Sequence, residues 1–177
     1  ADDLNRELAS LRIRTTNLPR EVMELRRRLC GELSMPEETL PFAGELLQVN
    51  GDHVAWEGAL ERVLRGLGLS MLVPEESYPD VAKYVDRTHL GNRLVYFRMK
   101  EDVDRRAPRT TDRRQLINKV DIKPDSRFKE WLEQELVRHF DYICCDTLAD
   151  FQRETKAVTR QGQVKSQGRR HEKDDRF

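Results

Sequence analysis

The sequence predicts a mixed α/β fold, of the α+β class, in two small lobes that follow a helical N-terminal segment. Three observations predict it. Short apolar runs alternate with amphipathic stretches of helical period in both halves of the chain. A charge-rich stretch with few apolar residues separates the halves, and leucines at coiled-coil spacing open the chain. We therefore predict root helices over 1–33, a first lobe over 34–100, a charged linker over 101–115, a second lobe over 116–168 and a polar segment over 169–177.

The N-terminal helices carry one narrow apolar stripe each. The first, over residues 1–14, is interrupted by Asn17 and Pro19, and the second is expected to stop at Gly31. Neither stripe can be buried by its own helix, so we expect a partner helix for each. The residues of this predicted coiled-coil seam are Leu4, Leu8, Leu11, Leu18, Val22, Leu25 and Leu29.

The first lobe is predicted to run strand, helix, strand, helix, strand. Ser34 opens a capping box before a short helix, and Asp52 is expected to cap a longer helix that ends at Gly66 and Gly68. The other helix should cover residues 77–88. The predicted strands are Glu45–Val49, Leu69–Val73 and Leu94–Phe97.

The second lobe repeats this alternation. A strand at Val120–Ile122 precedes a helix capped by Asp125 or Ser126, and a strand at 142–145 precedes a helix capped by Asp146. Strands at Ala157–Thr159 and 163–165, with a turn at Gly162, predict a terminal hairpin. We expect the two lobes to form two mixed sheets packed as one unit.

Composition narrows the class of protein. Charged residues make up 36% of the 177 residues, with 32 basic and 32 acidic side chains, and no apolar run approaches the length of a membrane span. The acidic N-terminal residues do not resemble a signal peptide. The three cysteines, Cys30, Cys144 and Cys145, form no disulfide or zinc-finger pattern, so we expect reduced thiols in a cytosolic protein.

The charges are unevenly distributed along the chain. Residues 29–61 contain no Lys or Arg, whereas residues 98–114 and 153–176 are basic. These basic stretches contain no aromatic residue, so contact with a nucleic acid would be with phosphates and not bases. An ordinary solvated surface is the alternative. The candidate phosphate contacts are Arg105, Arg106, Arg109, Lys156, Arg160, Lys165, Arg169 and Arg170.

Catalytic motifs are nearly absent. There is no phosphate-binding loop, no dinucleotide fingerprint, and no His spacing typical of a metal site, so we predict no catalytic and no metal-binding residues. The one enzyme-like pattern is Asp121 followed by Lys123, with Asp112 or Glu101 as a possible upstream carboxylate. Such a set can hold a divalent cation in nucleases. The alternative is a charged strand end before Pro124.

Several segments resemble the hinge domain of SMC-family ATPases. The resemblance lies in Phe42–Val49, Ala55–Leu64, Gly68–Val73 and the closing hairpin Ala157–Val164, and spans roughly residues 42–176. The amino-acid sequences of two segments, Thr88–Tyr96 and Arg170–Arg176, are most similar to those of MukB-like SMC proteins. Within that group they most resemble the SMC subunit of Wadjet anti-plasmid systems (JetC-type).

The resemblance implies a homodimer formed through complementary edges of the two lobes, between coiled-coil arms that end in ATPase heads. The polar segment 169–177 would then begin the returning coiled coil. SMC hinges often carry paired glycines at both edges, which this sequence lacks, so the geometry of the contact is open. The implied interface residues are Gly66, Leu67, Gly68, Leu69, Ser70, Met71, Gln163, Val164, Lys165, Ser166, Gln167 and Gly168.

The sequence thus predicts a non-enzymatic dimerisation module that helps to close a ring around DNA. The resemblance implies a cytoplasmic, nucleoid-associated, loop-extruding complex for plasmid defence or chromosome organisation, with DNA bound non-specifically. ATP and Mg would belong to the heads of the parent ATPase, with no cofactor in this part of the chain. Kleisin and other subunits would bind elsewhere, and no membrane is involved. Two alternatives stay open: a small metal-dependent nuclease using Asp121 and Lys123, and a scaffold that binds a helical partner through Leu4, Leu8 and Leu11.

Overall fold

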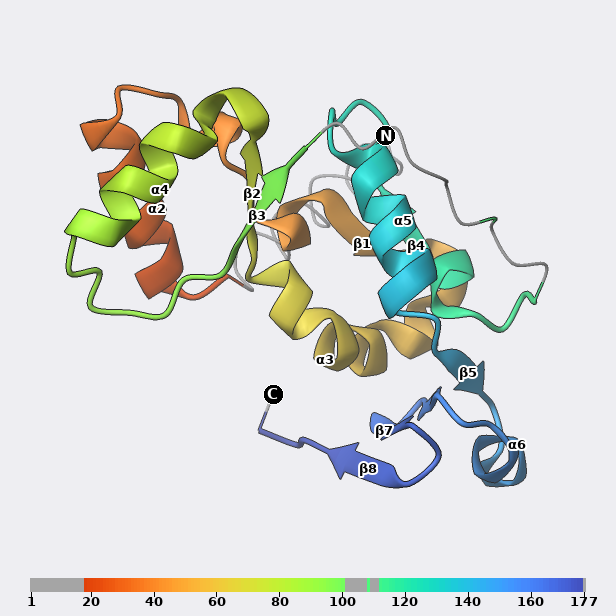
Figure 1. The fold of residues 1–177 in the computed structure, drawn as a ribbon. Coiled ribbons are helices and arrows are strands. Elements are labelled where there is room, and N and C mark those ends of the chain that lie inside the picture. Colours follow the sequence, from red (N-terminus) through yellow and green to blue (C-terminus); the bar gives the residue numbers. More distant parts are fainter. Residues whose placement is uncertain (1–17, 101–107, 109–111, 177) are drawn as a thin grey trace, which may run out of the picture. The chain divides into compact units, whose positions relative to one another are not determined.

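The chain divides into two compact units. The computed structural model describes residues 18–100, 108 and 112–176. Unit 1 comprises Ala1–Leu46 and Gly66–Asp104, and unit 2 comprises Leu47–Arg65 and Arg105–Phe177 (Figure 1). Residues 47–65 therefore group with the second half of the chain and not with the predicted first lobe. The physical reason is strand pairing, because β1 (Leu47–Val49) pairs antiparallel with β4 (Val120–Ile122).

Unit 1 is built on two parallel strands, β2 (Met71–Pro74) and β3 (Tyr96–Met99). The helices α2 (Arg20–Glu32) and α4 (Tyr78–Arg87) lie together beside these strands (Figure 1). Three short 3₁₀ turns complete the unit: η1 (Glu37–Thr39), η2 (Ala43–Leu46) and η4 (Glu75–Ser77). Its core side chains are excluded from solvent. They include Leu29, Phe42, Met71, Val73 and Val81.

Helix α2 corrects the prediction for the second root helix. It runs through Gly31, and Leu33 is its C-cap, so Gly31 is not the stop. Its stripe residues Leu18, Leu25 and Leu29 are buried, and Leu18 and Leu29 belong to the core of unit 1. The partner expected for this stripe is therefore unit 1 itself. The seam residues Leu4, Leu8 and Leu11 lie outside the described residues.

Unit 2 holds a second two-stranded pair and a mixed four-stranded sheet in the order β5-β6-β7-β8. The first pair of that sheet is parallel and the others are antiparallel. Its strands are β5 (Ile143–Cys145), β6 (Ala157–Thr159), β7 (Gln163–Ser166) and β8 (Arg170–Lys173). The helical elements are η3 (Gly51–Trp56), α3 (Glu57–Gly68, in unit 2 up to Arg65), η5 (Leu116–Lys119), α5 (Lys129–His139) and α6 (Leu148–Arg153).

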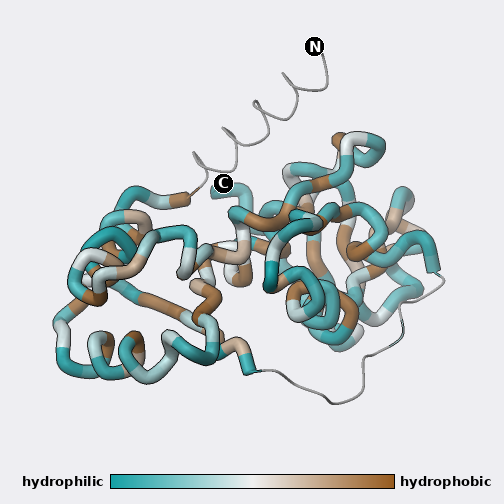
Figure 2. Tube along the Cα trace, turned by 90° about the horizontal axis from the view of Figure 1, so that it is seen from above, coloured by the Kyte–Doolittle hydropathy of each residue, from teal (hydrophilic) through white to brown (hydrophobic). Residues whose placement is uncertain are grey.

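The predicted mixed α/β class is confirmed, but several local details differ. The described residues form three sheets and not two. Residues 170–173 are a strand, where the polar start of a coiled coil was expected. Figure 2 shows hydrophobic and hydrophilic residues alternating along the helices, as expected for elements with one buried face. No described helix combines the length and apolar character that a membrane crossing requires.

Helix caps account for other differences. Asn50, and not Asp52, caps η3, because its side chain accepts a hydrogen bond from the Asp52 amide at 2.8 Å. Thr147, and not Asp146, caps α6, accepting from the Asp150 amide at 3.1 Å. The capping box predicted at Ser34 does not form: Ser34 has φ 53°, and Pro36 precedes η1. At η3 and α6 the observed polar cap lies within two positions of the predicted one, and sequence alone does not decide between such neighbours.

Candidate dimer and nucleic-acid interfaces

The predicted first-lobe edge, residues 66–73, is partly internal. Strand β2 pairs with β3 on one side. On its other side the Leu72 amide donates to the Pro41 carbonyl at 2.8 Å, and the Ser70 carbonyl accepts from the Ala43 amide at 2.9 Å. Met71 is 0% exposed. Only Gly66, Gly68 and Leu69 of the predicted residues on this edge present surface in the protomer.

Gly68 makes a close backbone approach within unit 1. A methyl group added to Gly44 would lie 3.0 Å from the Gly68 carbonyl oxygen, whereas one added to Gly66 would meet nothing within 4 Å. The resemblance suggested that glycines at this edge would permit close approach between protomers. The approach that the structure shows at Gly68 is intramolecular, and it brings the η2 turn against the end of α3.

The predicted second-lobe edge, residues 163–168, contains the internal strand β7, which lies between β6 and β8. The turn that follows β7 uses left-handed backbone at Gln167 (φ 56°) and Gly168 (φ 74°). Lys165 is only 3% exposed, and its Nζ lies 4.8 Å from the centre of the Phe151 ring. Lys165 is therefore not available as a surface phosphate contact, which corrects the prediction.

Strand β3 in unit 1 and strand β8 in unit 2 each end a sheet, and no described strand pairs with the outer side of either. The two-stranded pair of β1 and β4 in unit 2 has two further outer sides that no described strand covers. The opposite ends of the sheets that contain β3 and β8 are covered. Segment 41–43 bridges β2, and Gln115 bridges β5 at Ile143. All four residues of β8 are exposed and polar. We call β3 and β8 the open edges.

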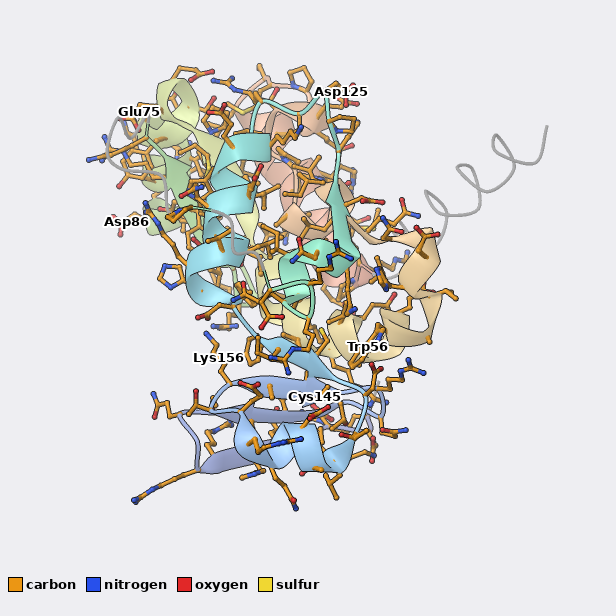
Figure 3. The ribbon with its side chains drawn as sticks, turned by 90° about the vertical axis from the view of Figure 1, so that its right-hand side faces the viewer. Trp56, Glu75, Asp86, Asp125, Cys145 and Lys156 are labelled. Atoms are coloured by element: carbon orange, nitrogen blue, oxygen red, sulfur yellow. The ribbon has the colours of Figure 1, made fainter. Side chains whose placement is uncertain are left out.

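The basic residues predicted in unit 2 are largely engaged by acids. Lys156 Nζ lies 2.6 Å from Asp141 and 3.0 Å from the His139 carbonyl (Figure 3). Arg160 pairs with Asp146 at 2.8 Å, and Arg170 pairs with Glu172 at 2.5 Å. Arg169 is exposed and has no ion pair within the described residues. Arg105, Arg106 and Arg109 lie outside the described residues.

Sequence reasoning missed a buried ion pair in unit 1. Arg26 of α2 pairs with Glu45 of η2, and the Arg26 side chain is 9% exposed. The guanidinium also lies over the Phe42 ring at 4.9 Å and donates to the Leu40 carbonyl at 3.5 Å. Glu45 in turn accepts from the Phe42 amide at 2.9 Å. The sequence held one indication of this pair. Arg26 directly follows Leu25 of the apolar stripe, so its side chain begins next to the buried face of the helix.

The described residues of the enzyme-like pattern, Asp121, Lys123 and Asp112, do not form a metal site. The Asp121 carboxylate accepts from the Asn50 side chain at 3.2 Å, and Asp112 pairs with Arg114 at 3.1 Å. Hydrogen bonds from Arg114 hold the pKa of Asp112 below its ordinary value. Among residues 18–100, 108 and 112–176, no three His, Cys, Asp or Glu side chains are grouped to bind a metal ion. Glu101 lies outside the described residues.

The adjacent cysteines are both in the interior. Cys144 and Cys145 are 3% and 2% exposed, although a strand should point them to opposite faces. Burial raises the pKa of the Cys144 thiol to about 12 and also raises the pKa of Cys145. Such thiols are poor nucleophiles at neutral pH, and they pack as small apolar side chains.

Comparisons with known proteins identify the fold. No family model and no curated protein matches the chain. The Pyrococcus furiosus SMC hinge domain matches with a TM-score of 0.60 and 17% identity, over 98% of this chain and 92% of that one. A P. furiosus Smc hinge with an extended coiled coil matches with a TM-score of 0.61 and 14% identity, over 99% and 68%.

A chain from the folded elbow of cohesin also matches, with a TM-score of 0.56 and 21% identity over 93% of this chain. This chain spans 24% of the length of that cohesin chain. Two of the three matched structures are hinge domains, and both align with almost the whole of this chain. The chain therefore has the mixed α/β fold of an SMC hinge domain.

Proposed function

We propose that this chain is the hinge, or dimerisation, module of an SMC-type complex and is not itself an enzyme. The observation that carries the proposal is the hinge fold with a sheet in each unit that ends in a strand with no described neighbour, β3 in unit 1 and β8 in unit 2. An open edge offers a row of backbone donors and acceptors that another strand can satisfy. In a twofold dimer, two different edges on each protomer give two equivalent contacts.

The open edges refine the predicted interface. We propose that β3 of one protomer approaches β8 of its partner, with Gly66, Gly68 and Leu69 and the turn at Gln167–Gly168 beside them. The charged side chains of β8 protect its edge from indiscriminate pairing. A contact of this kind is small and polar, so it should be weaker than an obligate, apolar dimer interface.

Sedimentation at micromolar concentration tests dimerisation directly. We expect a monomer–dimer equilibrium for the full chain. Cross-linking then tests the geometry: a Tyr96→Cys chain mixed with a Glu172→Cys chain of different length should form a disulfide heterodimer. A Val54→Cys chain, with an exposed thiol on neither strand, is the matched control. A single monomeric species at every concentration would overturn the proposal.

The wider role rests on the sequence resemblance. We propose that the parent protein is a MukB-like SMC ATPase, of the type found in Wadjet plasmid defence or in chromosome organisation. In that setting the hinge would close a ring around DNA in a loop-extruding complex, with ATP-binding heads and kleisin contacts elsewhere in the parent. A cytoplasmic, nucleoid-associated location follows from that role. Reconstitution of the parent complex with and without this hinge dimer, followed by a DNA-compaction assay, tests it.

Non-specific contact with DNA phosphates completes the proposal. Arg169 and the linker residues Arg105, Arg106 and Arg109 are the proposed contacts. The neutralised residues Lys156, Arg160 and Arg170 should add little, because each already has an acidic partner. Binding should weaken steeply with salt, with a slope of about −0.9 per phosphate contact. An affinity that does not change with salt would contradict this electrostatic account.

A further inference from the structure

An exposed basic loop projects from unit 1. It runs from Arg87, the last residue of α4, to Arg93 and contains no acidic residue. Arg87, His89, Asn92 and Arg93 are all exposed. Gly91 turns the chain with φ 75°, a conformation that favours glycine. We call residues 87–93 the basic loop.

Helix α2 adds a third guanidinium to this loop. Arg28 Nη2 donates to the Leu90 carbonyl at 3.3 Å, which places the exposed Arg28 against the middle of the basic loop. A carbonyl acceptor carries no formal charge, so this hydrogen bond does not neutralise the arginine. The structure thus brings Arg28, which is 59 positions before Arg87 in the sequence, into one cationic surface with Arg87 and Arg93.

Two acids lie next to this surface. Glu24, one turn before Arg28, pairs with Arg27 at 2.6 Å, and its pKa is lowered mainly by that hydrogen bond and in part by the charge of Arg28. Asp86 is exposed and directly precedes Arg87. Among the described residues no ion pair joins Arg28, Arg87 or Arg93 to a carboxylate.

The basic stretch of unit 2 has the opposite character. Six of its side chains have carboxylate partners, whereas Arg169 has none among the described residues and Lys165 is buried. The pairs are Arg153 with Asp150, Lys156 with Asp141, Arg160 with Asp146, Arg170 with Glu172, Lys173 with Asp175 and Arg176 with Asp174. A cation that is already paired gains less from a phosphate, since it must first lose its acidic partner. Within the described part of the chain, Arg28, Arg87 and Arg93 have no ion pair to break, and Arg87 lies 5.9 Å from the centre of the Tyr84 ring.

We propose that the basic loop together with Arg28 is a docking site for the phosphate backbone of duplex DNA. Guanidinium groups match phosphate oxygens with two parallel hydrogen bonds, and the exposed Asn92 amide adds a neutral donor. The loop contains no Phe, Tyr or Trp, and His89 is its only ring on which an unpaired base could stack. The inference rests on the proposed function, and it adds a contact in unit 1 to those proposed at Arg169 and in the linker.

Salt-dependent binding of a fluorescent duplex tests the site. Fluorescence anisotropy is measured from low to moderate salt for the full chain and for the double variant Arg87→Ala/Arg93→Ala. We expect about a tenfold or greater loss of affinity at low salt, and a salt slope shallower by about 1.8, since two phosphate contacts are lost. The matched control is Lys129→Ala/Arg153→Ala. It removes the same charge from exposed positions on α5 and α6 of unit 2 and should leave the slope unchanged.

Three outcomes would overturn the inference. Equal losses in the two double variants would show a response to net charge alone. An unchanged slope in Arg87→Ala/Arg93→Ala would remove the loop from the contact. Equal competition by polyglutamate, at matched charge concentration, would indicate an acidic protein surface as the partner. Sedimentation of the same variants separates this result from the hinge proposal, because dimers should persist when only the loop is altered.

Discussion

The two units of this protein use the same charged residue types in different ways. Unit 1 pairs a buried arginine, Arg26, with the partly exposed Glu45, and among the described residues the arginines of its basic loop form no ion pair. Unit 2 pairs most of the surface cations of residues 153–176 with acids. A net charge of zero therefore hides one unit with a structural pair and an available cationic surface, and another whose surface is largely neutralised.

The largest expected effect comes from breaking the buried pair of unit 1. Glu45→Ala leaves Arg26 charged in the interior and should lower the free energy of unfolding by about 3–5 kcal/mol. Urea unfolding followed by circular dichroism measures it. Glu24→Ala is the control, because its partner Arg27 is 65% exposed, and it should lower the free energy of unfolding much less than Glu45→Ala. Equal losses for the two variants would remove the contrast between buried and exposed pairs.

The next largest effect is expected in unit 2, at Gly162. Gly162 has φ 90°, and a methyl group there would overlap Arg62 Nη1 and lie 3.1 Å from Cδ. Arg62 Nη1 donates to the Gln161 carbonyl at 2.7 Å. Gly162→Ala should therefore cost about 1–3 kcal/mol in unfolding free energy.

Gly58→Ala is the matched control for that variant. Gly58 lies in α3, and an added methyl group meets nothing within 4 Å. Alanine is favoured over glycine in a helix, so this variant should gain up to about 1 kcal/mol. Thermal unfolding of the two variants, measured together, should give melting temperatures that move in opposite directions. A common fall would show that α3 does not tolerate the control.

A smaller effect is expected at the cap of α6. Thr147→Ala removes the hydroxyl that accepts from the Asp150 amide and should cost about 1 kcal/mol. Asp146→Ala removes the residue that the sequence suggested as the cap. It should cost less, because it loses only an exposed pair with Arg160. If chemical unfolding showed a larger loss of stability for Asp146→Ala than for Thr147→Ala, Asp146 would be the cap.

The smallest effect concerns the exposed end of unit 2. Hydrogen bonds from Arg176 lower the pKa of Asp174 to about 2 from the ordinary 3.8. A carboxyl group with a lowered pKa stabilises the fold above pH 3.8, and this contribution is lost as the pH falls towards 2. An NMR titration of the Asp174 side chain should show a midpoint near the lower value, and Arg176→Ala should raise it. A midpoint near 3.8 in the unaltered protein would show that the pair does not form in solution.

Much of the fold could be predicted because apolar periodicity is a local signal. The strands at Val120–Ile122 and Ala157–Thr159 form where predicted, and the helix predicted over 77–88 forms as α4, Tyr78–Arg87. The grouping of residues 47–65 with unit 2 depends on a pairing with Val120, across about 70 positions, and no local pattern encodes it. Caps were misplaced where two polar residues competed within one turn, as Thr147 did with Asp146.

The candidate interfaces were less accessible to prediction than the fold. The basic composition of residues 153–176 indicated a phosphate-binding surface, but charge in a sequence does not show which cations have acidic partners. Lys156 and Arg160 find theirs at Asp141 and Asp146, 15 and 14 positions away. Likewise, strands β2 and β7 were expected to be accessible edges, and only their pairing with 41–43 and with β8 shows that they are internal.

The burial of α2 has a mechanical consequence. Because Leu25 and Leu29 are buried and Arg26 is locked to the η2 turn, a pull on the chain ahead of Arg20 would load the interior of unit 1 directly. Helix α2 is packed into unit 1 through these side chains, so it cannot rotate independently of the unit. A force or torque applied ahead of Arg20 would therefore rotate unit 1 as one rigid unit. Helix α2 would detach only when the core of unit 1 begins to unfold.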